Sequence, residues 1–134
     1  PYMSKSDGRV VSNFIYQGLS EKNLTIAGDG LQTRTFCYVS DIVDGLFKFM
    51  DADISGPINL GSINEIGIRE LAELICKKLN ISKNFTFYNV SKSEPFNRRP
   101  SILSAKKILN WEPKINLENG IEKTIEFFKI NYFQ

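Results

Sequence analysis

One stretch decides the fold: Leu24-Thr-Ile-Ala-Gly-Asp-Gly-Leu-Gln-Thr-Arg-Thr-Phe-Cys-Tyr-Val-Ser-Asp41. Residues 24–27 are apolar or β-branched, which predicts a strand. Residues 28–30 read Gly-Asp-Gly and predict a turn, because glycine accepts positive φ without steric cost and aspartate can close a turn with its side chain. Residues 36–39 include Phe, Tyr and Val, so extended structure is expected to resume there.

The end of this stretch predicts the start of a helix. Ser40 or Asp41 would be a good N-cap, and the helix is expected to run from Asp41 to Met50. We expect its buried side to be formed by Ile42, Val43, Leu46, Phe47 and Met50.

The same stretch resembles a phrase of the extended short-chain dehydrogenases that modify nucleotide sugars, in particular the UDP-glucuronate decarboxylase (UDP-xylose synthase) branch. That branch carries a phrase close to L-T-V-Y-G-D-G-x-Q-T-R-x-F-x-Y-V-x-D, and this chain departs from it at Ala27, where an aromatic residue is usual. In the family the phrase lies in the C-terminal, substrate-binding part. The resemblance therefore implies that residues 1–134 form a nucleotide-sugar-binding C-terminal domain. It would be a small mixed α/β lobe that lacks the N-terminal Rossmann lobe.

Three further phrases match the same family. Residues 7–14 reproduce D-G-R-V-V-S-N-F, which follows the catalytic residues in the family, and the chain begins at Pro1, so we expect a fragment of a longer enzyme. Residues 94–101 resemble D-P-x-x-R-x-P-D, with Ser101 in place of the last Asp; serine can still cap the next helix. Residues 59–61 match N-[LI]-G, which epimerases and dehydratases share, so this phrase indicates the superfamily but not the reaction.

Periodicity and turn residues predict the remaining elements. Asp7 is expected to cap the first helix and Asn116 the last. Asn110 is expected to end a helix in the left-handed conformation, with Trp111 packed under the corner that follows. The other expected helices are 7–19, 68–79, 102–109 and 117–131, and the other expected strands are 57–60 and 85–90.

Composition argues against several kinds of function. A formal charge of +2 is too small to argue for nucleic acid, and no run approaches the roughly 18 apolar residues that a membrane span needs. The chain has no histidine, which removes the commonest general base and metal ligand, and no metal site is expected. Cys37 and Cys76 lack metal or redox spacing and are expected to be structural, Cys76 in the core. Reduced thiols favour a cytoplasmic protein.

The arginines are distributed as a diphosphate site would require. The chain has five arginines against twelve lysines, and four of the five fall in loops or at helix starts. Arginine holds phosphate oxygens by bidentate hydrogen bonds. Arg34 follows the turn and could reach across a cleft, whereas Arg9 lies in a first helical turn, where an anion would offset its unfavourable charge. Arg98 and Arg99 form a stiff basic loop before Pro100.

The resemblance implies which residues bind the substrate. Arg9 and Arg34 match arginines placed to contact the nucleotide or diphosphate. Arg98 matches an arginine that faces the diphosphate or the sugar, and the strand at 25–27 passes the uracil and can bind it through backbone groups. The expected substrate-binding residues are thus Arg9, Thr25, Ile26, Ala27, Arg34 and Arg98.

By the same resemblance, the full-length protein would be an NAD-dependent UDP-glucuronate decarboxylase that makes UDP-xylose, and a homodimer. This chain has no G-x-x-G-x-x-G at a strand-to-helix turn. The family's catalytic Tyr-x-x-x-Lys pair and its NAD site are expected in the N-terminal lobe. We expect no catalytic or cofactor-binding residue here, and no activity from these residues alone.

Three alternatives stay open. A related nucleotide-sugar 4-epimerase or 4,6-dehydratase shares most of these phrases, although Gln-Thr-Arg and Val-Val-Ser-Asn-Phe favour the decarboxylase. A non-catalytic UDP-sugar-binding module could use the same cradle. A basic nucleic-acid-binding domain is the least favoured, because the aromatic strand at 85–90 suits a core better than base stacking.

Overall fold

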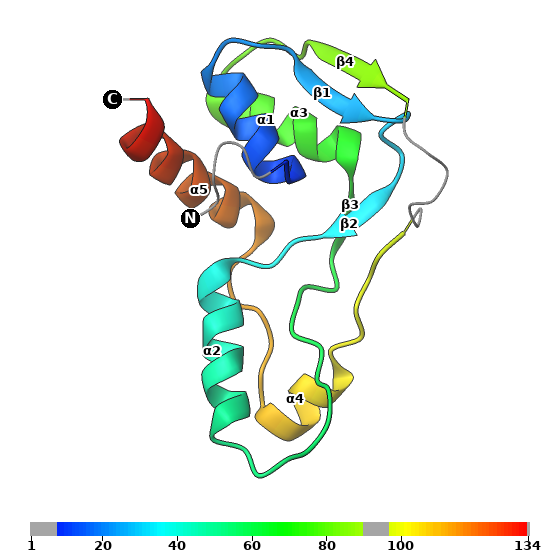
Figure 1. Cartoon of the computed structure of the whole chain (residues 1–134), viewed down its shortest axis with the longest axis vertical. Helices are drawn as coiled ribbons and strands as arrows, with labels where there is room; N and C mark the ends of the chain where they lie inside the picture. The colour runs from blue at the N-terminus through cyan, green and yellow to red at the C-terminus, as the bar shows by residue number, and fades with distance from the viewer. Residues whose placement is uncertain (1–7, 90–96, 134) are drawn as a thin grey trace.

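The structure, a computed structural model, describes residues 8–89 and 97–133. Figure 1 shows an elongated molecule with helices and a sheet gathered in one half and further helices in the other. The helices are α1 (Val10–Leu19), α2 (Val39–Met50), α3 (Ile68–Leu79), α4 (Leu103–Leu109) and α5 (Leu117–Tyr132). The strands are β1 (Leu24–Ala27), β2 (Thr33–Thr35), β3 (Glu65–Gly67) and β4 (Phe85–Tyr88). The expected mixed α/β fold is confirmed.

Two small sheets organise the chain. β1 and β4 pair in parallel, with Leu24 opposite Phe85, and the connection between them includes α3. β2 and β3 pair antiparallel, with Arg34 opposite Ile66. The second sheet lies between the two halves of the molecule (Figure 1), so it links the larger half to α2 and α4.

The larger half has a continuous apolar core, which we call the main core. It is built where α1, α3 and α5 pack around β1, and the helical spacing of apolar residues on α3 is confirmed by their burial. The main core consists of Phe14, Ile15, Leu24, Ile26, Ile68, Leu71, Ala72, Ile75, Cys76, Ile121, Ile125 and Phe128.

The other half has a much smaller core, which we call the small core: Ile102, Ala105, Leu109 and Trp111. Polar contacts reinforce it. The indole Nε1 of Trp111 donates to the backbone oxygen of Asp41 at 2.9 Å. The buried carboxylate of Asp41 accepts from the backbone nitrogens of Lys114 at 3.1 Å and Ile115 at 2.9 Å.

Several predictions of local structure are confirmed. The Asn116 side chain accepts from the backbone nitrogen of Asn119 at 2.9 Å and so caps α5. Asn110 ends α4 in the left-handed region with φ 46°. Trp111 and Cys76 are buried.

Other boundaries differ from the prediction because tertiary contacts decide them. β2 lies at Thr33–Thr35, whereas the sequence predicts extended structure at residues 36–39. α2 begins at Val39 instead of Asp41, and no side chain caps it. Asp41 was predicted as a possible N-cap, but its carboxylate is used by the segment at 114–115. α1 begins at Val10 with Arg9 at the N-cap position, whereas the predicted cap Asp7 is outside the described residues.

The predicted strand at 57–60 is wrong. These residues have no strand partner in the described part of the chain, although Ile58 and Leu60 pack against the small core. β3, which the prediction missed, is three residues long and exists because β2 pairs with it. Ser101 does not cap α4: Ile102 occupies the N-cap position and no side chain caps it. β4 is described to Tyr88, and Val90 lies outside the described residues.

The predicted buried side of α2 is also wrong. Asp41 and Gly45 are the buried residues of this helix. Gly45 allows the close approach, because a Cβ there would lie 2.9 Å from Leu60 and 3.0 Å from Trp111 side-chain atoms. The opposite side carries an exposed row that we call the α2 stripe: Val39, Val43, Leu46, Phe47 and Met50.

Candidate functional site

The strand β1 presents backbone groups on the edge away from β4. The backbone nitrogen of Thr25 donates to Oε1 of Gln17 at 2.9 Å, and the backbone oxygen of Ala27 accepts from Nε2 of Gln32 at 2.8 Å. The Thr25 hydroxyl accepts from Nε2 of Gln17 at 2.7 Å, which ties β1 to α1. The side-chain carboxamides of Gln17 and Gln32 therefore form hydrogen bonds with the backbone groups on this edge.

Ile26 differs from its two neighbours. Its side chain is 0% exposed and belongs to the main core. The side chain of Ile26 therefore cannot touch a ligand in this conformation, and its contribution to a site is limited to the backbone.

A tight turn returns the chain from β1 toward β2. Gly28 and Gly30 have φ of 63° and 76°, and Oδ1 of Asp29 accepts from the backbone nitrogen of Leu31 at 2.9 Å, as the sequence predicts. A Cβ on Gly30 would lie 2.9 Å from Cγ2 of Ile26. The turn therefore requires glycine and brings Gln32 back onto the edge of β1.

Arg34 lies in β2, half-buried, and Nη1 donates to the backbone oxygen of Thr33 at 2.7 Å. Thr33 forms a parallel bridge with Asn97, so the exposed Arg98 follows alongside Arg34. Oγ1 of Thr33 lies 3.0 Å from Oδ1 of Asn97, which supports the bridge. The fold thus brings together two arginines that are 64 positions apart in the sequence.

Arg99 differs from Arg34 and Arg98, because it lies near the carboxylate of Glu65 in β3. Oε1 of Glu65 accepts from Thr33 Oγ1 at 2.7 Å, and Oε2 lies 3.9 Å from Nη1 of Arg99. The neighbouring arginines in the sequence therefore differ: Arg99 faces a carboxylate, whereas Arg98 follows the bridge beside Arg34.

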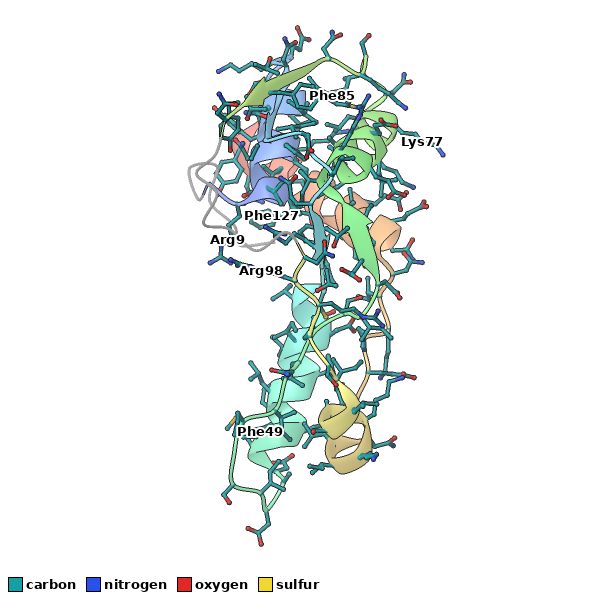
Figure 2. The ribbon with its side chains drawn as sticks, turned by 90° about the vertical axis from the view of Figure 1, so that its right-hand side faces the viewer. Arg9, Phe49, Lys77, Phe85, Arg98 and Phe127 are labelled. Carbon is teal, nitrogen blue, oxygen red and sulfur yellow. The ribbon has the colours of Figure 1, made fainter. Side chains whose placement is uncertain are left out.

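Arg9 is exposed at the N-cap position of α1 and lines a pocket of about 420 Å³. Phe36, two residues after Arg34, lines the same pocket, together with Tyr38 and Leu117. In Figure 2, Arg9 and Arg98 extend from the same side of the molecule. The pocket is otherwise lined mainly by apolar side chains, so Arg9 is its charged member.

The described residues offer little for acid–base or metal chemistry. Burial, reinforced by the charge of Asp41, raises the pKa of Cys37 to about 11, so its thiol is protonated at neutral pH. In residues 8–89 and 97–133 no group of three or more His, Cys, Asp or Glu side chains could hold a metal ion. None of the helices described here has the length and apolarity to cross a bilayer.

One Tyr-x-x-x-Lys spacing does occur, from Tyr88 to Lys92. Tyr88 is the last residue of β4, whereas a spacing of four residues brings two side chains next to each other when both lie in one helix. Lys92 lies outside the described residues. This spacing therefore gives no support for a catalytic pair.

Sequence reasoning missed the residues that hold the arginines and the strand in place: Asn13, Gln17, Gln32, Thr33, Glu65 and Asn97. Gln32 and Thr33 lie in the Gln-Thr-Arg phrase, so that phrase was a usable signal. The others are polar residues that only the pairing of distant segments brings to the site.

Comparison with known proteins first defines the class. Residues 1–61 match the model of the NAD dependent epimerase/dehydratase family. The fold matches UDP-glucuronic acid 4-epimerase from Bacillus cereus in complex with UDP-glucuronic acid and NAD, with a TM-score of 0.88 at 28% identity over 93% of this chain and 41% of that one. It also matches UDP-glucose 4-epimerase from Thermotoga maritima with UDP-glucose, with a TM-score of 0.89 at 26% identity over 93% of this chain and 40% of that one.

Curated sequences narrow the relationship further. The chain is 45% identical to UDP-glucuronic acid decarboxylase 5 of Arabidopsis thaliana over 97% of its own length, and 47% identical to UDP-glucuronic acid decarboxylase 1 of Danio rerio over 94%. The similarity to decarboxylases expected from the sequence phrases is confirmed. The chain spans 38% and 30% of the length of these two relatives.

Proposed function

We propose that this chain is the substrate-binding portion of an NAD-dependent UDP-glucuronate decarboxylase, the enzyme that converts UDP-glucuronate to UDP-xylose and CO2. The observation that carries the proposal is the bridge between Thr33 and Asn97, which sets Arg98 beside Arg34. Sequence identity of 45% and 47% to two decarboxylases supports the particular reaction.

Five of the six expected site residues have a role in this proposal, and the buried Ile26 side chain has none. Arg34 and Arg98 each follow a residue of the backbone bridge, and guanidinium groups bind phosphate oxygens by paired hydrogen bonds. Arg9 adds a third charge at the neighbouring pocket. Thr25 and Ala27 offer backbone groups that could meet a uracil edge once the carboxamides of Gln17 and Gln32 move aside.

The residues of this chain do not fit an NAD site. The glycine-rich turn that places a pyrophosphate at a helix N-terminus is absent from the sequence. We propose that NAD binding and catalysis belong to another part of the full-length protein, and that these residues alone are inactive. Turnover of NAD by the 134-residue chain alone would contradict this.

The test is to incubate the full-length gene product with NAD and UDP-glucuronate and to weigh the nucleotide sugar by mass spectrometry. Loss of CO2, giving a UDP-pentose, would support the decarboxylase. Arg98→Ala should then raise KM for UDP-glucuronate, because it removes one of the two arginines that follow the bridge. Lys107→Ala, on the exposed surface of α4, is the matched control and should leave KM unchanged.

A 4-epimerase is the second candidate, because the fold matches a UDP-glucuronic acid 4-epimerase with a TM-score of 0.88. An unchanged mass with altered sugar stereochemistry would establish it. A dehydratase would release water instead of CO2. Saturable UDP binding without any reaction would indicate a non-catalytic UDP-sugar-binding module.

We further propose that the full-length protein is a cytoplasmic homodimer. Dimerisation is implied by the family resemblance, and two cysteines without a disulfide suit a reducing compartment. Light scattering of the purified protein and fractionation of its native cells would test these two statements separately.

A further inference from the structure

The start of the segment 97–101, which carries Arg98, is held by one side chain of β2. Oγ1 of Thr33 lies 3.0 Å from Oδ1 of Asn97, next to the backbone bridge between the same two residues. The same hydroxyl donates to Oε1 of Glu65 in β3 at 2.7 Å. A single hydroxyl group therefore connects the sheet of β2 and β3 to the residue that precedes Arg98.

The other end of this segment is held by residues 59–61, a phrase that the sequence alone links to the superfamily and to no particular role. Nδ2 of Asn59 donates to the backbone oxygen of Ser101 at 3.2 Å. A Cβ on the buried Gly61 would lie 3.1 Å from Cγ of Pro100, so glycine allows the two segments to approach this closely. Figure 1 shows them side by side between β3 and α4. The phrase therefore forms a second anchor of the segment.

The two arginines between these anchors have different surroundings. Oε2 of Glu65 lies 3.9 Å from Nη1 of Arg99. Within residues 8–89 and 97–133, no carboxylate forms an ion pair with the exposed Arg98. Pro100 favours an extended backbone at Arg99, and in extended backbone neighbouring side chains point to opposite sides. An anion that approaches this segment therefore meets the guanidinium of Arg98 rather than that of Arg99.

We propose that Thr33 and Asn59 are positioning residues of the substrate site, which hold the segment so that Arg98 can bind an oxyanion of the substrate. The inference rests on the proposed function, because it takes the ligand to be UDP-glucuronate. The diphosphate and the sugar carboxylate of that ligand are both oxyanions that a guanidinium binds by paired hydrogen bonds. Thr33 and Asn59 act through Arg98 and do not touch the ligand.

The physical reason is that a segment held in advance binds an anion at lower cost. A loop and a long arginine side chain lose conformational freedom when they bind, and part of that loss is avoided where the backbone is already fixed. Removal of either anchor should therefore weaken binding, although the charge of the site stays the same.

The experiment is a double-mutant cycle on the full-length gene product, with the Kd of UDP measured by calorimetry and KM measured for UDP-glucuronate. Thr33→Val removes the hydroxyl and keeps the side-chain shape, whereas Thr33→Ser retains a hydroxyl. Thr35→Val, at another half-buried threonine of β2, is the matched control. Thr33→Val and Asn59→Ala are also made in an Arg98→Ala background. Asn97→Ala breaks the first anchor from an exposed side chain and replaces Thr33→Val if that variant lacks the parent circular dichroism spectrum.

We expect Thr33→Val and Asn59→Ala to raise KM for UDP-glucuronate about fivefold in the parent and less than about twofold in the Arg98→Ala background, because residues that act through one another are not additive. Thr33→Ser and Thr35→Val should match the parent. No loss, or the same loss in both backgrounds, overturns the proposal for that anchor. Equal losses for Thr33→Val and Thr33→Ser overturn it for the hydroxyl of Thr33.

The two ligands identify the oxyanion, because UDP carries the diphosphate without the sugar carboxylate. Coupling to Arg98 in the Kd of UDP as well as in KM assigns the diphosphate to Arg98. Coupling in KM alone assigns the carboxylate. Both results support the positioning role.

The same measurements separate this proposal from the proposed function. Coupling in the Kd of UDP without loss of CO2 from UDP-glucuronate leaves the positioning residues standing and removes the decarboxylase. Loss of CO2 without coupling in either measurement does the reverse. A parent protein that neither binds UDP nor releases CO2 overturns both.

Discussion

The two cores of this molecule are built in different ways. The main core packs side chains from α1, α3, α5 and β1, and the exposed face of α3 is polar. The small core has four buried apolar residues and depends on polar contacts through Asp41 and Trp111. Its helix α2 keeps an apolar face in contact with solvent. The comparison teaches that the larger half is held by apolar packing over many residues, whereas the smaller half depends more on polar contacts between distant segments.

The largest effect is expected from the main core. Phe128→Ala should lower the free energy of unfolding by about 3–5 kcal/mol, because it removes a completely buried aromatic ring and leaves a cavity. Urea denaturation followed by circular dichroism measures the change. Leu103→Ala removes an apolar residue that is 64% exposed and is the control with a small effect. A loss below that of the control would show that the main core does not carry the stability of the chain.

The small core should be most sensitive to its buried carboxylate. Asp41→Ala leaves the backbone nitrogens of Lys114 and Ile115 without their acceptor, which should cost about 1–3 kcal/mol of unfolding free energy. Asp44→Ala on the same helix removes only an exposed ion pair with Lys48 and is the matched control. Equal midpoints of urea unfolding for the two variants would show that the Asp41 carboxylate does not stabilise the small core.

A smaller effect is expected where the connection from the small core enters α5. Asn116→Ala removes the side-chain acceptor of the Asn119 backbone nitrogen and should cost about 1 kcal/mol. Thermal unfolding provides the measurement. Asn119→Ala, at an exposed position in the same turn, should be neutral or slightly stabilising. A neutral Asn116→Ala would mean that packing alone sets the start of α5.

The alkylation rates of the two cysteines offer a comparison of the two cores that needs no stability measurement. Burial and the charge of Asp41 raise the pKa of Cys37 to about 11, and only the thiolate reacts with iodoacetamide. At pH 8, alkylation of Cys37 should therefore be roughly hundredfold slower than that of an unstructured cysteine, and its rate should rise until the pH reaches about 11. Cys76, completely buried in the main core, should react only when the chain unfolds.

Peptide mapping of the alkylated protein would assign the two rates. Asp41→Asn should speed the reaction of Cys37 at pH 8, because it removes the charge that helps to raise the thiol pKa. A rate for Cys37 equal to that of an unstructured cysteine at this pH would show that the edge of the small core opens freely.

Much of the candidate site followed from local sequence. The Gly-Asp-Gly turn and the strand before it depend on residues close in the chain, and both predictions are confirmed. Arg34 lies within β2 rather than between the turn and the next strand. The site roles of Arg9, Thr25, Ile26, Ala27, Arg34 and Arg98 remain predictions. The structure adds that the Ile26 side chain is buried and that Arg98 lies beside Arg34.

What could not be read from the sequence depends on pairing between distant segments. β3 forms because β2 pairs with it. The carboxylate of Asp41 serves the backbone at 114–115 instead of its own helix. Which apolar face of α2 is buried depends on the close approach at Gly45, and periodicity alone favoured the wrong face.

The sequence by itself determined the helices with one strong apolar face, the caps at Asn110 and Asn116, the glycine turn and the similarity to nucleotide-sugar enzymes. These features rest on backbone preferences and side-chain spacing within a few residues. Only the tertiary structure decided that Arg98 stands beside Arg34 and that the α2 stripe faces outward. Those outcomes depend on contacts between segments far apart in the chain, and the closure of a long loop brings such segments together in a way that no local preference specifies.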